Sequence, residues 1–210
     1  MDVAIIGAGN VGSGLTTALT AAGHTVTVTS TTPEEVEKLA NDVGAKAAGS
    51  NVDAVANGDV VILAVYYPSV AGILGELGDA LDGKILIDVS NRTNEIPGLA
   101  VDGGSNAEEI QTTVPKARVV KAFNTVFASH LTDPTIDGVP LDGFVASDDD
   151  GAREVVLELV GSIGLRPVNA GSLASARILE AMEALNMGLQ MRDGGSWNNG
   201  WKLLEPGSTR

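Results

Sequence analysis

Short apolar runs alternate with longer amphipathic stretches along most of the chain. The apolar runs predict strands at residues 2–7, 24–30, 59–65, 84–90 and 117–123. Apolar positions spaced by 3.6 residues predict helices at residues 10–23, 32–44, 69–81 and 106–115. Runs that are apolar throughout are typical of a parallel sheet covered on both faces. The repeated strand–helix order, joined by right-handed crossovers, therefore predicts an α/β fold with a doubly wound parallel sheet.

The second helix carries clear start signals. Thr32 is a natural N-cap residue, Pro33 stands at the first helical position, and Glu35 completes a capping box with Thr32. These signals predict a helix that begins at residue 32 or 33.

The pattern changes at about Thr125, where a loop-rich stretch begins. Beyond it, strands are expected at 143–148 and 165–171 on either side of a helix at 149–163, and a last helix at 172–189. We therefore expect two units, a sheet domain of residues 1–124 and a smaller C-terminal unit of residues 125–210.

Composition narrows the classes of function. The chain has no cysteine and two histidines, which excludes disulfides and thiolate nucleophiles and leaves no metal site to expect. Its net charge of −14 argues against nucleic acid and against anionic membrane surfaces. No apolar run reaches the roughly 20 residues that span a bilayer, and the first residues lack a basic leader. We therefore expect a cytoplasmic protein.

The sequence IIGAGNVGSG places Gly7, Gly9 and Gly12 in the spacing G-x-G-x-x-G, between the first strand and the first helix. In this context Gly7 permits a tight turn, Gly9 lets a pyrophosphate approach the backbone, and Gly12 lets helix and strand pack closely. The helix N-terminus adds N–H groups and a positive dipole end. The pattern predicts a dinucleotide-binding Rossmann fold.

The end of the second strand indicates which dinucleotide is bound. NAD calls for an acidic residue there, but the chain has Thr29, Ser30 and Thr31 and no acid until Glu34. Hydroxyl groups can donate hydrogen bonds to a 2′-phosphate, which an acid would repel. Strand threonines are also ordinary β-formers. The missing acid favours NADP over NAD, with Lys38 as a remote phosphate partner.

Three further parts of the chain are more specific than the glycine turn. They are ILAVYYPSV (62–70), IDVSNRTNE (87–95) with GSNAEEIQTTVPKARVVKAFNTV (104–126), and GLRPVNAGSLASARILEAM (164–182). Together they resemble the NADP oxidoreductase, coenzyme F420-dependent family. The middle part is also similar to the cytosolic reductase domain of the STEAP metalloreductases.

This resemblance implies that NADP lies along the strand ends, with its nicotinamide in a cleft against the C-terminal unit, where a deazaflavin or a flavin stacks on it. It also implies a homodimer. One position departs from the deazaflavin-dependent pattern, because Thr31 stands where those members place an arginine. By the resemblance, the cofactor-binding residues are Gly9, Asn10, Val11 and Gly12 for the pyrophosphate, Ser30 and Thr31 for the 2′-phosphate, Val65 and Tyr66 along the path from adenosine to nicotinamide, and Asn91 with Ala122–Asn124 around the nicotinamide.

Hydride transfer between two stacked rings needs positioning rather than a protein acid or base, so we assign no catalytic side chain. Lys121, near the end of a buried strand, is expected to form a structural ion pair rather than to face the cofactor. Arg177 could meet an acidic group of a deazaflavin or could be an exposed helix charge.

The expected function is hydride exchange between NADPH and coenzyme F420, a small-molecule redox co-substrate. Two alternatives stay open. One is an NADPH-dependent reductase of a flavin or a small organic acceptor, and the other is a non-catalytic module that senses NADPH.

Overall fold

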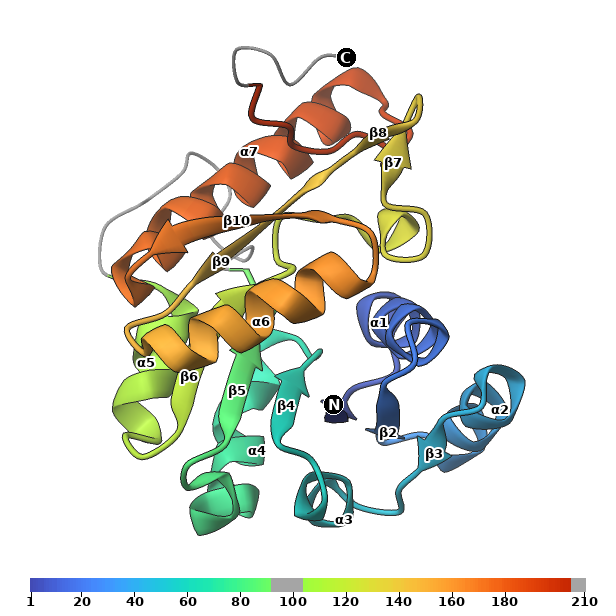
Figure 1. Cartoon of the computed structure of the whole chain (residues 1–210), viewed down its shortest axis with the longest axis vertical. Helices are drawn as coiled ribbons and strands as arrows, with labels where there is room; N and C mark the ends of the chain where they lie inside the picture. The colour runs from blue at the N-terminus through green and yellow to red at the C-terminus, as the bar shows by residue number, and fades with distance from the viewer. Residues whose placement is uncertain (92–103, 205–210) are drawn as a thin grey trace.

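The computed structural model describes residues 1–91 and 104–204, and it contains a mostly parallel sheet between two layers of helices (Figure 1). The eight strands of the sheet lie in the order β10-β9-β6-β5-β4-β1-β2-β3. Their bounds are β1 Asp2–Ile6, β2 Thr25–Thr29, β3 Lys46–Ala47, β4 Val60–Leu63, β5 Ile85–Asp88, β6 Arg118–Ala122, β9 Asp142–Ala146 and β10 Arg166–Gly171. This is the predicted doubly wound α/β fold, and the prediction of fold class is confirmed.

Alternate residues of the buried strands point to opposite faces of the sheet, as a period of two requires. Val3 and Ile5 belong to one apolar cluster, whereas Ala4 and Ile6 belong to another. The first cluster is completed by helices α1 Asn10–Ala21, α2 Pro33–Val43 and α6 Asp150–Ser162. The second is completed by α3 Asn51–Ala56, α4 Tyr67–Leu77 and α5 Asn106–Thr113.

Several short elements were not predicted from the sequence. They are β3, α3, the 3₁₀ turns η1 Gly78–Leu81, η2 Ala128–His130 and η3 Leu173–Ser175, and a small hairpin of β7 Thr135–Ile136 and β8 Val139–Pro140. Elements this short show too few residues for a hydrophobic period to be recognised.

The strands of the C-terminal part join the same sheet. β9 pairs antiparallel with β6, with Lys121 opposite Ala146 and Ala122 opposite Val145, and β10 pairs parallel with β9 through the crossover helix α6. The division into two units at residue 124 stays a prediction. The structure adds that both parts share one sheet.

The predicted capping box of the second helix is wrong. Thr32 is the N-cap and Pro33 stands at the first position, but the Thr32 side chain makes no capping hydrogen bond. Instead, the Thr32 N–H donates to Ser30 Oγ at 3.1 Å, and this turn gives Thr32 a backbone ψ of 87° that differs from the extended cap geometry. A complete capping box is found at α5, where Ser105 pairs with Glu108.

Helix α7, Ala176–Asp193, buries polar side chains beside apolar ones, unlike an ordinary surface helix. Its inward face carries polar side chains that are nearly excluded from solvent, Glu180, Glu183, Asn186 and Gln190. Its outward face carries the exposed apolar side chains Ile178, Leu185 and Met191.

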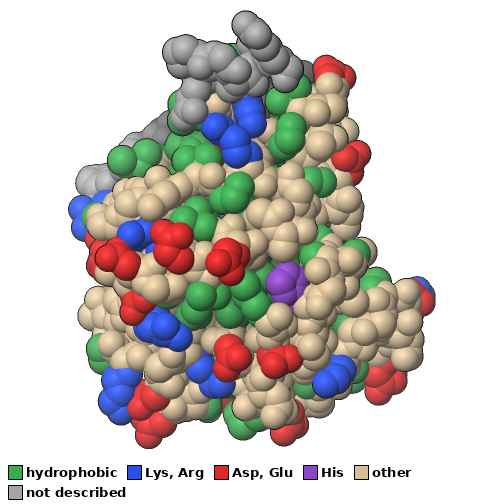
Figure 2. Space-filling view, in the orientation of Figure 1, with side chains coloured by type: hydrophobic (Ala, Val, Ile, Leu, Met, Phe, Trp, Pro, Cys, Tyr) green, Lys and Arg blue, Asp and Glu red, His purple; other side chains and the backbone are tan. Residues whose placement is uncertain are grey.

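Charged side chains of both signs are interspersed over the face of the molecule shown in Figure 2. Among the helices of the described residues, none combines the length and the apolar character needed to cross a membrane.

Candidate functional site

The turn between β1 and α1 contains two glycines, Gly7 and Gly12, at positions where any larger residue would clash with the backbone of the chain. A Cβ atom on Gly7, which has a φ of 109°, would lie 2.2 Å from the Ala64 carbonyl oxygen. A Cβ atom on Gly12 would lie 1.9 Å from the Gly7 carbonyl oxygen. Both contacts are with backbone atoms, which cannot move aside cheaply. Gly7 and Gly12 therefore hold strand, turn and helix in close contact.

Packing within the described chain does not require a glycine at position 9, because a Cβ atom there would meet nothing within 4 Å. It is the exposed N-cap of α1 and has no side chain to accept hydrogen bonds from the first helical turn. The first-turn N–H groups at Asn10, Val11 and Gly12 have no intrahelical acceptor, as at any helix start. The open surface at Gly9 and these N–H groups suit a phosphate anion.

At the end of β2, Ser30 is half-buried and Thr31 is exposed. Ser30 Oγ accepts the Thr32 N–H at 3.1 Å, which orients the hydroxyl group outside the strand. Lys38, a predicted remote partner for a phosphate, instead forms an ion pair with Asp42 one turn along α2. The polar groups that remain at this strand end are hydroxyls.

Two residues follow the end of β4. Val65 is half-buried, and its side chain lies 3.0 Å from the position of a Cβ atom on Gly7. Tyr66 is the N-cap of α4, and its side chain is 87% exposed. The two residues therefore stand beside the glycine turn, one packed against it and the other in solvent.

The ends of β5 and β6 are joined by a pair of asparagine side chains. Asn91 Nδ2 donates to the Asn124 carbonyl oxygen at 3.1 Å, and Asn124 Nδ2 donates to Asn91 Oδ1 at 2.8 Å. Asn124 Nδ2 also donates to the Leu179 carbonyl oxygen of α7 at 3.1 Å. Asn124 Oδ1 is buried and has no hydrogen-bond partner among the described residues. A buried acceptor without a partner lowers the stability of the fold by about 1–3 kcal/mol, and an N–H donor of a ligand could satisfy it.

The backbone between the two ends is unusual. Ala122 is fully buried at the end of β6, and Phe123, which follows it, has a φ of 62° and is 1% exposed. A left-handed conformation is uncommon for a bulky residue and costs on the order of 1–3 kcal/mol. Strain of this kind is concentrated at functional sites. No pattern in the sequence predicted it.

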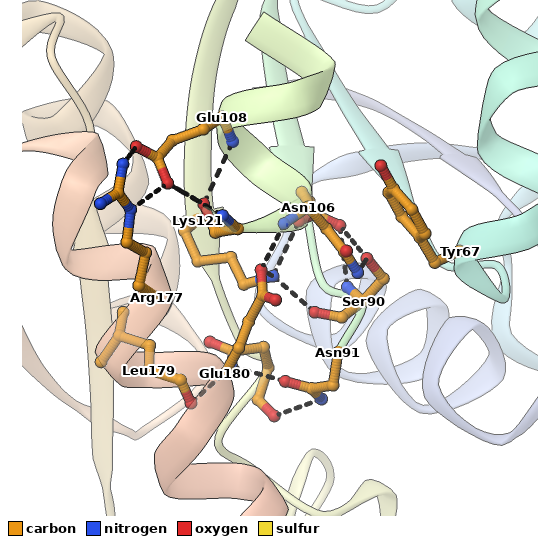
Figure 3. A network of polar contacts seen from close by, with 12 residues as sticks. Tyr67, Ser90, Asn91, Asn106, Glu108, Lys121, Arg177, Leu179 and Glu180 are labelled. Carbon is orange, nitrogen blue, oxygen red and sulfur yellow. Dashed lines mark hydrogen bonds and ion pairs between the residues drawn. The ribbon is translucent and has the colours of Figure 1, made fainter. Parts of the chain in front are cut away.

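A buried polar network adjoins Asn91 through Ser90, the residue that precedes it (Figure 3). Lys121 Nζ donates to Asp88 Oδ2 at 2.7 Å, to Glu180 Oε1 at 2.8 Å and to the Ser90 carbonyl oxygen. Burial raises the pKa of Glu180, against the attraction of Lys121. The sequence predicted that Lys121 would form a structural ion pair, and this is confirmed. It did not identify the partners, which come from β5 and from α7.

Arg177 lies at the edge of this network and is already engaged. Its Nε and Nη2 atoms donate to Glu108 Oε2 and Oε1 at 2.7 and 2.6 Å, and this pairing lowers the pKa of Glu108 (Figure 3). Arg177 is an exposed charge on α7, as one of the two predictions had it, and it carries a bidentate ion pair that the sequence did not indicate; the contact with a deazaflavin stays a prediction.

All these groups lie at one edge of the sheet. The strands β2, β1, β4, β5 and β6 are parallel neighbours, so their carboxyl ends and the loops that follow them are aligned. Ligands bind at this edge in open α/β sheets, near the point where the strand order reverses. In this chain that point lies between β1 and β4, beside the glycine turn. The structure therefore brings the predicted site residues to one edge of the sheet.

Comparison with known proteins agrees with this geometry. The family model "NADP oxidoreductase coenzyme F420-dependent" matches residues 2–92. The chain is also 34% identical over 212 residues to the F420-dependent NADP reductase of Methanothermobacter thermautotrophicus, and this alignment covers 92% of the chain and 90% of the relative. The chain belongs to the F420-dependent NADP oxidoreductase family.

A second group of relatives shares this domain within a longer protein. The chain is 33% identical over 180 residues to the metalloreductase STEAP3 of Rattus norvegicus, covering 86% of the chain. It spans only 36% of the length of that metalloreductase. Both resemblances predicted from the sequence are therefore confirmed.

A solved structure of the family has the same fold throughout. It is a candidate F420-dependent NADP reductase from Arthrobacter sp. FB24, 28% identical, with a TM-score of 0.86 over 98% of this chain and all of the other. Membership of the F420-dependent NADP oxidoreductases makes NADP(H) the cofactor for which the site is built, and it confirms the predicted class of NADP-dependent oxidoreductase. The predicted homodimer and the individual roles of the site residues stay predictions.

Proposed function

We propose that the protein transfers a hydride between NADPH and the deazaflavin coenzyme F420. The observation that carries the proposal is the nearly end-to-end match with the F420-dependent NADP reductase of Methanothermobacter thermautotrophicus. The match includes the C-terminal part, where the acceptor is expected to bind.

The residues present fit a dinucleotide at two places. One is a sterically free surface, and the other is a hydrogen-bond acceptor that the described residues leave unsatisfied. The surface at Gly9 has room for a pyrophosphate next to the N–H groups of Asn10, Val11 and Gly12. Asn124 Oδ1, which has no hydrogen-bond partner within residues 1–91 and 104–204, can accept a hydrogen bond from the carboxamide of a nicotinamide. The other proposed cofactor contacts are Ser30 and Thr31 at the 2′-phosphate, Val65 and Tyr66 along the path, and Asn91 with Ala122 at the nicotinamide.

This arrangement needs no protein nucleophile. When bound, NADPH supplies a hydride, which together with a solvent proton reduces the deazaflavin and leaves NADP⁺. The contribution of the chain is to orient the reactants, because hydride passage requires the reacting carbons to be roughly 3–3.5 Å apart. The asparagine pair and the strained Phe123 backbone are suited to this role, since Asn124 and Phe123 are both buried.

A different acceptor is the second candidate. The metalloreductase relatives share this domain, and their name indicates an acceptor other than F420. We therefore retain a flavin or a small organic molecule as the alternative acceptor, and an NADPH sensor as the alternative without catalysis.

The deciding experiment mixes purified protein with oxidised F420 and NADPH and follows the loss of the visible absorbance of the deazaflavin. Rapid bleaching is expected with NADPH and slow bleaching with NADH. Parallel reactions contain FAD, FMN or no acceptor. Reduction of a flavin without bleaching of F420 would replace the acceptor, and tight NADPH binding without reduction of any acceptor would favour the sensor.

Ser30→Asp is expected to weaken NADPH binding by roughly 100-fold, since a carboxylate replaces a hydroxyl that can donate to the 2′-phosphate. Binding of NADH is expected to be unchanged or tighter, because an acid at this position can accept from the ribose hydroxyls. The turn should survive, since an Asp oxygen can accept the Thr32 N–H in place of Ser30 Oγ. Fluorescence titration of NADPH and NADH measures both affinities.

Ser30→Asn is the matched control, because asparagine has the shape of aspartate without its charge. It is expected to lose much less NADPH affinity than Ser30→Asp. Equal losses in the two variants would show that the strand end does not recognise the 2′-phosphate by charge.

A further inference from the structure

Lys121 is fully buried, and all three of its N–H bonds are used inside the protein. It is the second-last residue of β6 and stands opposite Asp88 in the ladder with β5. The Lys121 ammonium group therefore has no donor left for a cofactor at the sheet edge. Any effect of Lys121 on a bound cofactor must therefore act through its three hydrogen-bond acceptors, Asp88, Ser90 and Glu180.

Those three acceptors belong to three different parts of the structure. Asp88 is the last residue of β5, Ser90 lies in the turn after β5, and Glu180 projects inward from α7 (Figure 3). The ammonium group is thus a common point of attachment for two strands, a turn and a helix.

The turn after β5 is fixed by additional contacts. Asp88 Oδ1 accepts the Ser90 N–H at 2.9 Å and the Ser90 hydroxyl at 2.6 Å. Asn106 Nδ2 donates to Ser90 Oγ at 2.9 Å, and the Asn106 N–H donates to Glu180 Oε1 at 2.9 Å. The start of α5 is therefore tied to the same group of side chains.

Each end of the asparagine pair is adjacent to a group that Lys121 holds. Ser90 precedes Asn91, and Glu180 follows Leu179, whose carbonyl oxygen accepts from Asn124. Lys121 itself lies three residues before Asn124 in the chain. The Lys121 ammonium group is therefore bonded to a residue next to Asn91 and to a residue next to Leu179, which holds the side chain of Asn124.

We propose that Lys121 is a positioning residue, which sets the Asn91–Asn124 pair by tying the turn after β5 and helix α7 to β6. The proposal rests on the proposed function, in which this pair orients the nicotinamide. A displacement of about 1 Å can lower a rate by about 100-fold. A small movement of the asparagine pair after loss of the Lys121 contacts should therefore have a measurable effect on hydride transfer.

The test compares Glu180→Gln with the double variant Lys121→Met/Glu180→Gln. The double variant removes one positive and one negative charge, so the formal charge of the network stays the same as in the wild type. The glutamine introduced at position 180 can still accept the Asn106 N–H. The comparison between the two variants isolates the loss of the Lys121 ammonium group.

Three quantities are measured on the wild type and on each variant: affinity for adenosine 2′,5′-bisphosphate, polarisation of the nicotinamide fluorescence of bound NADPH, and the rate of hydride transfer. In the double variant we expect bisphosphate affinity within about twofold of wild type, since that site is remote. We expect reduced polarisation and hydride transfer slower by about tenfold or more. Val156→Ala, which creates a cavity at the buried face of α6, is the control for lost stability alone. It should change neither the polarisation nor the rate of hydride transfer.

Unchanged polarisation and rate in a folded double variant would overturn the proposal and leave Lys121 as a stabilising ion pair only. If the double variant does not fold, Glu180→Leu tests the link between α7 and β6, because it frees α7 from Lys121 while the Lys121–Asp88 pair remains. Glu180→Gln, which can still accept the Asn106 N–H, is then the comparison. Failure of the wild type to bind NADPH would overturn the proposed function itself. Binding of NADPH without reduction of F420 would change the acceptor, and the fluorescence readout would still decide the role of Lys121.

Discussion

Gly12→Ala is expected to lower the free energy of unfolding by about 3 kcal/mol, because its Cβ atom would lie 1.9 Å from the Gly7 carbonyl oxygen. Neither group is a flexible side chain, so α1 must move away from the strand end. For a chain of this size the change corresponds to a fall in melting temperature of roughly 6–12 °C, at 2–4 °C per kcal/mol. Calorimetry or thermal circular dichroism measures it.

Gly9→Ala is the matched variant at the neighbouring glycine of the same motif. A Cβ atom there meets nothing within 4 Å, so the melting temperature should stay close to that of the wild type. NADPH binding should weaken by about tenfold or more, because the methyl group occupies the surface that a pyrophosphate approaches. Similar stability losses in both variants, or full NADPH affinity in Gly9→Ala, would contradict the separate roles assigned to these glycines.

The second large effect concerns Glu183, on the inward face of α7. Its side chain is 3% exposed, its Oε2 atom has no hydrogen-bond partner within the described parts of the chain, and burial raises its pKa from 4.5 to about 8. Between these two pKa values the folded protein holds a proton that the unfolded chain has released. The free energy of unfolding should therefore fall as the pH rises, by about 1.4 kcal/mol for each pH unit.

Glu183→Gln is expected to remove this dependence, because glutamine has the shape of the protonated acid and does not titrate. Over the roughly three pH units from 5 to 8 the contribution of Glu183 is on the order of 4 kcal/mol, a large share of the stability of a typical domain. Urea denaturation at several pH values measures it in both proteins. Glu154→Gln, at an exposed position of α6, should keep the wild-type slope. The same slope in Glu183→Gln would show that the acid does not retain its proton in the folded state.

The central part of the fold could be predicted because its strands are buried on both faces. The apolar segments at β1, β4 and β5 are continuous, and the helices between them repeat apolar residues every 3.6 positions. The antiparallel entry of β9 could not be predicted, since an apolar run carries no information about strand direction. The capping box at Thr32 failed for a local reason, because the Ser30 hydroxyl competes for the same turn.

The site was predictable where a residue type is required by close backbone contact, as at Gly7 and Gly12. It was not predictable where partners are distant in sequence. Glu180 lies 59 residues from Lys121, and an acid on a helix is ordinarily expected to face solvent. Exposed apolar residues on α7, such as Ile178 and Leu185, obscure in the sequence which side of the helix is buried. The motif at 87–95 extends beyond the described residues, so its remaining contacts stay predictions.

The antiparallel ladder between β6 and β9 limits how the chain can be divided. A fragment ending at residue 124 would keep the glycine turn, but it would leave β6 as a sheet edge with unpaired backbone groups next to the apolar Val119 and Val120. Such edges recruit strands from other molecules and promote aggregation. The ammonium of Lys121 would also lose its carboxylate partner on α7. We therefore expect a fragment of residues 1–124 to aggregate when it is produced alone, so that engineering of the glycine turn has to retain the C-terminal part as well.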